Sequence, residues 1–327
     1  MTGDVDPSAD FLLRIPALPD FDPSDVVDSA VVRGLVRSWP RRATVRRSEP
    51  DLDALFEPER ADFPESMLPF GEDARYRDLD RGTRKRIRAW GWIAYNKSVV
   101  DIEQHVVNPG FQLLFQDGLG TGLGDGMRAA AVQAMVDEQY HTLMHLNASA
   151  LTRTHRGRSM PDSALPYGLT VRRQREEVLA QADPRSAALT TLAFCTVAET
   201  SIGAYLSLLC DDADLQPVNR ATVTLHRRDE RAHASVAAEL TGAVYERLGA
   251  DDRRTLIGAL VTGVDAFTGT DYSTWAAILA AEGVPHAAAM LADAAARPGD
   301  HRLMQDCTAI RHLMESLGAA EDVPDTW

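Results

Sequence analysis

The stretch HRRDERAH, residues 226–233, places two histidines and a glutamate on one face of a helix. His226, Glu230 and His233 lie four and then three positions apart. Because a helix advances about 100° per residue, the three side chains project within roughly 40° of one another. For any single one of these residues, a solvated helix face is the better explanation. The rest of the chain must therefore show whether they act together.

A second copy of this motif lies earlier in the chain. Residues 137–141 read DEQYH and residues 229–233 read DERAH, so both contain D-E-x-x-H. A single E-x-x-H is common by chance in helices. Two copies in one chain indicate an internal repeat of a metal-binding helix.

Each copy also follows a further glutamate at the distance of a helical hairpin. Glu103 lies 35 residues before Glu138, and Glu199 lies 31 residues before Glu230. This arrangement matches the carboxylate-bridged dimetal site, in which two helices give one glutamate each and two give Glu-x-x-His. The pattern predicts four helices around two metal ions.

Charge favours this interpretation over an accidental cluster. Four glutamates in a bundle core could not all stay ionised without partners, because each unpaired buried charge is costly. Two divalent ions would balance four carboxylates, and oxidation by two electrons would leave a positive charge that bound peroxide or oxide could compensate. Carboxylate and imidazole ligands without thiolate favour iron or manganese over a structural zinc site. The site therefore suggests oxygen chemistry.

Five further polar residues need an assignment. His226 lies one turn before Glu230 and can supply a third nitrogen to one of the two metals. Asp137 and Asp229 can orient the histidine of the opposite motif, although a surface position is the alternative for both. His145, one turn after His141, is assigned a packing or surface role, and His105 should point away from Glu103.

Helical periodicity dominates the chain, and strand signals are almost absent. The sequence predicts an all-α fold that forms a single domain over residues 1–327, with a loop-rich segment (1–76), a metal-binding helical core (77–248) and C-terminal helices (249–327). Asn108-Pro109-Gly110 should end the long helical pattern at 78–107, and Asp125 should cap the next helix. Helices are expected at 25–39, 78–107, 126–155, 170–181, 185–210, 214–248, 251–267, 272–282 and 285–316.

Composition excludes several classes of protein. The chain has 327 residues and a formal charge of −14, which opposes a nucleic-acid surface despite the basic run RGTRKRIR at 81–88. That run is interpreted as a solvated helix face, with a docking patch for an acidic electron donor as the alternative. We see no signal peptide and no membrane-spanning stretch, so a cytoplasmic location is expected. The three scattered cysteines argue against disulfides and thiolate metal sites, and we expect them to be packing residues of the core.

The motifs and their surroundings resemble the AurF/CmlI-type arylamine N-oxygenases. The resemblance covers nearly the whole chain, and the histidine four positions before Glu230 is its most specific mark. It is carried by SWPRRA (38–43), WIAYNKSVVDIEQ (92–104), VDEQYHTLMH (136–145), VAETSIGAYLSLL (197–209) and LHRRDERAH (225–233).

The resemblance implies a fold, a cofactor and an activity. The fold would be a ferritin-like four-helix bundle core with additional flanking helices, and its metal site would hold two iron ions. An external electron donor, a reductase or ferredoxin, would reduce the centre, and O₂ would oxidise an aromatic amine through a peroxo-diferric intermediate. The product would be a hydroxylamine, nitroso or nitro compound in natural-product biosynthesis, and the chain would form a homodimer. The implied ligands are Glu103, Glu138, His141, Glu199, His226, Glu230 and His233.

Two positions depart from the aminobenzoate-oxidising branch of this family. Ser98 and Gly203 stand where an arginine and an asparagine are expected to anchor the substrate carboxylate, and a carboxylate requires a charged or multi-donor partner. Gly203 also removes bulk one turn beyond Glu199. We therefore expect a longer or less acidic arylamine than p-aminobenzoate. The pocket is expected to be lined by Tyr95, Ser98, Val99, Thr196, Gly203 and Leu206, with Cys195 as a further candidate.

Two other functions use similar ligands. A ferritin-like iron-handling protein would take no organic substrate, but such chains are about half this length. A desaturase or a ribonucleotide reductase small subunit would share the bundle, but the third histidine fits neither well.

Overall fold

The computed structural model describes residues 21–25, 28–48, 50–210, 212–297 and 306–324. The acidic N-terminus MTGDVDPSADF lies outside these residues. Within them the chain is mainly helical and has no strand, and an isolated bridge joins Ala61 and Leu215. The predicted all-α class is confirmed.

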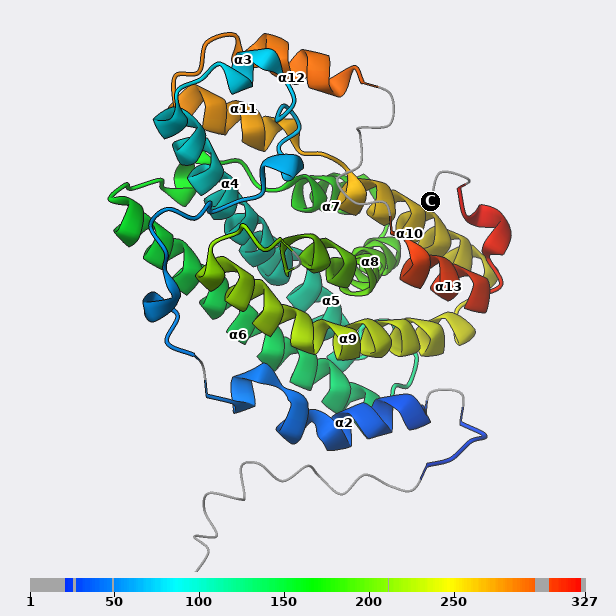
Figure 1. The fold of residues 1–327 in the computed structure, drawn as a ribbon. Coiled ribbons are helices and arrows are strands. Elements are labelled where there is room, and N and C mark those ends of the chain that lie inside the picture. Colours follow the sequence, from blue (N-terminus) through cyan, green and yellow to red (C-terminus); the bar gives the residue numbers. More distant parts are fainter. Residues whose placement is uncertain (1–20, 26–27, 49, 211, 298–305, 325–327) are drawn as a thin grey trace, which may run out of the picture.

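Four long helical segments form the core (Figure 1). The first is α4 (Arg81–Ile102), which continues through a π-helical turn (Glu103–Val107) into α5 (Asn108–Phe115). The others are α6 (Asp125–Arg156), α8 (Pro184–Cys210) and α9 (Pro217–Glu246). Helix α8 is central, since it packs against α5, α7, α9, α10 and α13.

The remaining helices flank this core. Helix α2 (Ala30–Arg42) lies across α6 and α9, and α7 (Leu169–Ala180) and α10 (Ala250–Thr268) cover α8. Helices α3 (Ala74–Arg77), α11 (Tyr272–Ala281) and α12 (Ala287–Ala295) gather at one end of the molecule (Figure 1). Helix α13 (Thr308–Ser316) packs on α8. Single 3-10 turns occur at Thr44–Arg46, Asp53–Leu55, Glu65–Met67, Asp162–Ala164 and Ala320–Asp322.

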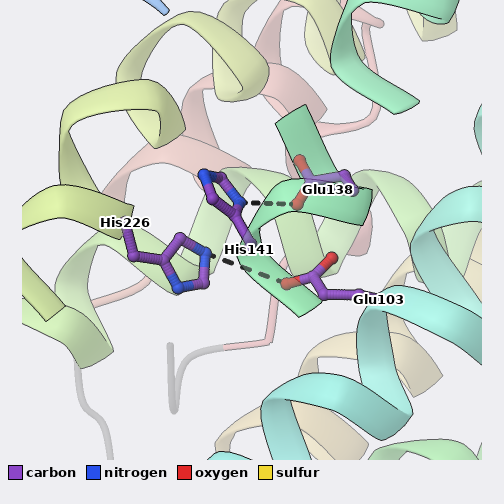
Figure 2. A group of neighbouring side chains, drawn as sticks. All are labelled: Glu103, Glu138, His141 and His226. Atoms are coloured by element: carbon purple, nitrogen blue, oxygen red, sulfur yellow. Dashed lines mark hydrogen bonds and ion pairs between the residues drawn. The ribbon is translucent and has the colours of Figure 1, made fainter. Parts of the chain in front are cut away.

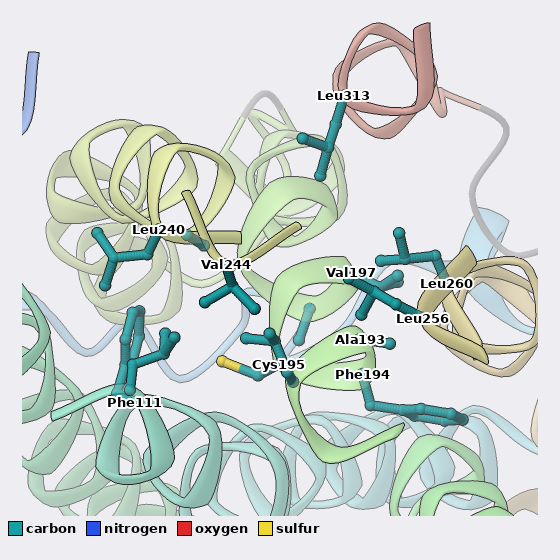
Figure 3. Packing of buried hydrophobic residues seen from close by; sticks show 14 of the residues in the cluster. Phe111, Ala193, Phe194, Cys195, Val197, Leu240, Val244, Leu256, Leu260 and Leu313 are labelled. Carbon is teal, nitrogen blue, oxygen red and sulfur yellow. The ribbon is translucent and has the colours of Figure 1, made fainter. Parts of the chain in front are cut away.

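Two separate apolar clusters hold these helices together. One joins α5, α8, α9, α10 and α13 (Figure 3), and the other joins the first half of α4 to the end of α8 and to α11. Along α8 the first cluster ends at Ala198 and the second begins at Ile202. Along α9 the second cluster includes Val223, and the first cluster begins at Val236. The layer between the clusters is where the motif residues of the four core helices lie.

By length and composition one described helix, α8, could cross a membrane. In the structure 72% of its most apolar window is buried. Its apolar character therefore follows from its central position in the core.

Proline does not end α2 where the sequence predicts. The expected helix at 25–39 was to stop before Pro40, but α2 begins at Ala30, after the Ser29 cap, and runs through Pro40 to Arg42. Proline lacks the N–H that would bond to the carbonyl of Val36. The Gln133 side chain lies 3.4 Å from that carbonyl and donates to it instead, so a neighbouring helix replaces the missing bond.

The predicted end of the long helix at Asn108-Pro109-Gly110 is also wrong. The chain stays helical because residues 103–107 form a single π-helical turn just before Pro109. Such a turn contains one residue more than a regular α-helical turn. The Asn108 amide donates to the Glu103 carbonyl at 2.8 Å, which stabilises the widened turn. Pro109 then falls in the first turn of α5, where a missing N–H costs little.

Three smaller predictions also differ from the structure. Asp125 is the first residue of α6 and Gly124 is its cap, without a side-chain hydrogen bond. The single helix expected at 285–316 is replaced by α12 and α13, and residues 298–305 between them are not described. The basic run at 81–88 is not simply solvated, because Arg86 binds Glu282 and Arg88 donates to the Phe63 carbonyl.

Gly110 marks the closest approach of α5 to α8. A Cβ atom at this position would lie 2.2 Å from the Cys195 Cβ and 2.5 Å from its Sγ. No real side chain tolerates such distances, so glycine here fixes the spacing between the two helices.

Gly110→Ala should therefore lower the free energy of unfolding by about 1–3 kcal/mol through overpacking. The matched control is Gly258→Ala on α10, where an added Cβ meets nothing within 4 Å and should stabilise the protein by up to about 1 kcal/mol. Urea unfolding monitored by circular dichroism measures both. Equal midpoints for the two variants would contradict the close approach.

Candidate metal centre

All seven predicted ligands converge in the layer between the apolar clusters, and all are buried. Figure 2 shows four of them, Glu103, Glu138, His141 and His226. The His226 Nε2 lies 3.8 Å from Glu103 Oε1 and 2.9 Å from Glu230 Oε1. Helices α4, α6 and α9 thus present their side chains to one point.

The other end of the layer is closed by His233 and Glu199. The His233 Nδ1 lies 2.5 Å from Glu138 Oε1, 3.5 Å from Glu230 Oε1 and 3.7 Å from Glu199 Oε2. Helix α8 therefore contributes its glutamate beside the second motif.

These side chains form two overlapping groups of donors. The first holds Glu103, Glu138, His141 and His226, and the second holds Glu138, His141, Glu230 and His233, with the ligand atoms of each group within 4.8 Å of one another. Two groups that share Glu138 and His141 have the form of a site for two adjacent ions. Glu199 extends the second group through His233.

Most of the donor atoms point at one another without making hydrogen bonds; the exception is the pair His141 Nδ1 and Glu138 Oε2, which lie 2.9 Å apart. Buried atoms that lack a hydrogen-bond partner occur on six of the seven side chains: Glu103 Oε2, Glu138 Oε1, Glu199 Oε2, His226 Nε2, both Glu230 oxygens and His233 Nδ1. Buried polar atoms are nearly always paired, because an unpaired one costs about 1–3 kcal/mol. A concentration of such atoms at one point fits metal ions as their partners.

Burial and mutual repulsion perturb the acids at the centre. Burial raises the pKa of Glu103 and of Glu199 well above the ordinary value, and the neighbouring carboxylates raise both pKa values further. For Glu138, burial acts in the same direction, but the two facing histidines His233 and His141 outweigh it and hold its pKa well below the ordinary value.

The histidines respond in opposite ways. Burial lowers the pKa of His141, but Glu138 and Asp229 outweigh it and raise the pKa to about 10. The pKa of His233 is raised well above the ordinary value in the same way, by Glu138 and Asp137 against the effect of burial. The pKa of His226 is lowered by burial and by the charge of His141.

Two aspartates hold the outer nitrogens of two histidines. Asp229 Oδ2 lies 3.2 Å from His141 Nε2, and Asp137 Oδ2 lies 3.0 Å from His233 Nε2. Each aspartate is thus hydrogen-bonded to the histidine of the opposite motif. This leaves Nδ1 of both rings directed toward the carboxylates of the centre.

The aspartates are fixed by the end of α2 and the turn after it. The Trp39 Nε1 donates to Asp137 at 2.9 Å, and the Thr44 backbone N–H donates to Asp229 at 3.1 Å. Burial lowers the pKa of the half-buried Arg42, and the charges of the two aspartates offset part of this lowering. Sequence reasoning missed these contacts, although the quoted SWPRRA stretch contains Trp39 and Arg42.

His145 is fully buried, which excludes the surface role that was one of its two predicted assignments. Its Nε2 lies 2.9 Å from His226 Nδ1, and its Nδ1 lies 2.7 Å from Asn96 Oδ1. Sequence reasoning missed this contact too, although His145 lies one turn from His141. His105 does point away from the centre, since its ring meets the Tyr167 ring edge-on at 5.3 Å.

The predicted pocket residues fall into three places. Tyr95, Ser98 and Val99 line a cavity between α4, α7, α8, α10 and α11. Gly203 lines a separate groove together with Glu199 and Glu230. Thr196 and Leu206 line neither: Thr196 shares a hydrogen bond of 2.7 Å with Thr241, and Leu206 is packed in the second apolar cluster.

Cys195, also a pocket candidate, packs in the first apolar cluster against α5. Cys307 is buried and Cys210 is half-buried, and none of the three cysteines forms a disulfide with another described residue. Their positions agree with the predicted role as packing residues for Cys195 and Cys307.

Metal binding should release protons and strengthen as the pH rises. The pKa of about 10 means that His141 carries a proton at neutral pH without metal, and the raised pKa values of His233, Glu103 and Glu199 act in the same direction. Because the ligand forms are deprotonated, lowering the pH must weaken binding. Calorimetric titration with Co²⁺ between pH 6 and 9, in buffers of different ionisation enthalpy, measures this. Affinity that is independent of pH, without proton release, would contradict it.

Comparison with known proteins agrees with this geometry. The family model described as "P-aminobenzoate N-oxygenase AurF" matches residues 26–318. A relative from Streptomyces thioluteus, described as "4-aminobenzoate N-oxygenase", is 34% identical over 301 residues, which cover 91% of this chain and 89% of the relative. The resemblance inferred from the motifs is confirmed, and the chain belongs to the p-aminobenzoate N-oxygenase AurF family.

Proposed function

We propose that the protein is an O₂-dependent arylamine N-oxygenase with a di-iron centre held by the seven converging side chains. The observation that carries the proposal is the set of unpartnered donor atoms on six of these seven buried residues. Membership of the family supports the oxidation of an aromatic amine as the reaction.

The donor set supports two iron ions as the cofactor. Four carboxylates balance two divalent cations, and the ligand atoms are oxygen and imidazole nitrogen without thiolate. When bound, the ions would supply the electrons and the Lewis acidity that O₂ activation needs. An external reductase or ferredoxin would supply the electrons for each turnover.

The surrounding residues set the protonation of the ligands. Asp229 and Asp137 accept the outer N–H of His141 and His233, so the Nδ1 lone pairs remain free for the metals. Trp39 and Thr44 hold the aspartates in place. The two apolar clusters cover the layer on either side.

We propose that the arylamine occupies the cavity lined by Tyr95, Ser98 and Val99. Aromatic side chains from three segments, among them Phe63, Tyr95 and Trp275, line it and suit a flat ring. The Tyr95 hydroxyl is buried and has no hydrogen-bond partner among the described residues, so it can bind a polar group of the substrate.

This cavity offers no free cation for a carboxylate. Lys97 is the only Lys or Arg among its described lining residues, and it is already paired with Asp101. Together with Ser98, this supports a longer or less acidic arylamine than p-aminobenzoate. An amine of natural-product biosynthesis fits this description.

Other features complete the proposal. The whole chain would act as one cytoplasmic oxygenase domain.

A homodimer is supported by a stripe of exposed apolar residues on α6, formed by Val132, Val136, Leu143 and Leu146. A sizing column should show twice the chain mass, and Leu143→Asp should shift elution toward the monomer. A large cage would instead favour the alternative of a ferritin-like iron store.

The activity itself is tested by mass spectrometry. Reduced, iron-loaded protein given ¹⁸O₂ should add labelled oxygen to the nitrogen of at least one arylamine in a panel, and elemental analysis should find about two iron atoms per chain. Glu199→Gln should abolish the product. Glu246→Gln, at the exposed end of α9, is the matched control and should retain it. Stoichiometric zinc, or no oxidised amine from the whole panel, would reject the proposal.

The proposed substrate preference is tested by restoring the missing anchors. Ser98→Arg should lower the KM for p-aminobenzoate about tenfold or more, because one charge-assisted hydrogen bond contributes roughly 1.5–3 kcal/mol. Gly203→Asn tests the other groove, where an added Cβ meets nothing within 4 Å. The control substrate is p-aminobenzamide, whose KM neither variant should lower. Faster wild-type turnover of p-aminobenzoate than of any larger arylamine would contradict the preference.

A further inference from the structure

Behind His226 lies a row of two uncharged side chains that the proposed chemistry does not use. Asn96 on α4 contacts His145 on α6, and His145 contacts His226 on α9. All three are buried. The row therefore connects three core helices and ends at a proposed metal ligand.

The direction of each hydrogen bond follows from its far end. The Trp92 backbone carbonyl can only accept, and the Asn96 Nδ2 donates to it at 2.8 Å. The Asn96 Oδ1 must then face His145, and an amide oxygen can only accept. His145 therefore carries its proton on Nδ1.

His145 has no acidic neighbour that would favour a second proton. Its hydrogen-bond partners are Asn96 and His226, and the Tyr95 ring meets it edge-on at 5.7 Å. A neutral imidazole protonated on Nδ1 can only accept at Nε2. The Nδ1 of His226, 2.9 Å away, must therefore be the donor.

This polarity leaves the Nε2 of His226 without a proton. That atom has no hydrogen-bond partner, and it faces Glu230 Oε1 at 2.9 Å and Glu103 Oε1 at 3.8 Å. A nitrogen lone pair that faces carboxylate oxygens is repelled unless a cation lies between them.

We propose that Asn96 and His145 are positioning residues that fix the tautomer and orientation of His226 as an Nε2 metal ligand. The inference rests on the proposed dimetal centre. It also separates His226 from the other two histidines, which are held by aspartates. Because Asn96 and His145 are uncharged, they add no negative charge beside His226.

The protonation pattern is tested directly by NMR. In protein labelled with ¹⁵N-histidine and loaded with diamagnetic Zn²⁺, long-range ¹H–¹⁵N spectra should show His145 protonated on Nδ1 only. The signals are assigned by their loss in His145→Gln. A His145 ring protonated on Nε2, or on both nitrogens, would overturn the proposal.

Metal affinity supplies the second test. Wild-type protein should bind two Co²⁺ ions, and His145→Leu should weaken one of them about 10–100-fold, with a change in its visible absorption, while the other is unaffected. His145→Gln should restore binding, because its amide can donate to Asn96 and accept from His226. Met144→Leu, a buried neighbour on α6, is the matched control and should bind both ions normally.

The outcomes distinguish this inference from the proposed function. Wild-type protein that binds no Co²⁺ would reject the dimetal centre itself. Two normal ions in His145→Leu, no rescue by His145→Gln, or equal weakening by Met144→Leu would each overturn the positioning role alone.

Discussion

The burial of four carboxylates at one level of a helix bundle is the constraint on which the rest of the structure depends. Glu103, Glu138, Glu199 and Glu230 repel one another in a buried layer. Such a layer is stable only if cations or protons neutralise it. The apolar clusters on either side supply the packing energy that holds the glutamates together, and the histidines and aspartates around them distribute the compensating charge.

The surroundings of the three histidines are not equivalent. His141 is hydrogen-bonded to Asp229, which in turn accepts from the Thr44 backbone N–H. His233 is hydrogen-bonded to Asp137, which accepts from the Trp39 side chain. His226 is hydrogen-bonded instead to the neutral imidazole of His145. The two ends of the centre thus differ in the charge behind their ligands.

Sequence spacing predicted the bundle and the converging side chains because helix periodicity fixes which residues share a face. It failed where another helix decides the outcome. Pro40 stays within a helix because Gln133 on α6 serves the free carbonyl, and Pro109 is accommodated by a widened turn. The contact between His145 and His226 depends on how α6 packs against α9, which spacing within either helix does not reveal. Which of the predicted pocket residues line the cavity depends on how five helices, α4, α7, α8, α10 and α11, pack together.

The π-helical turn that begins at Glu103 has a further consequence for how the gene can vary. The turn contains one residue more than a regular turn, so it rotates everything after it by about 100° relative to the first half of the rod. Loss of a single codon between 103 and 107 would restore a regular helix and would turn Gly110 away from Cys195. Evolution can therefore exchange residues in this turn far more readily than it can shorten it.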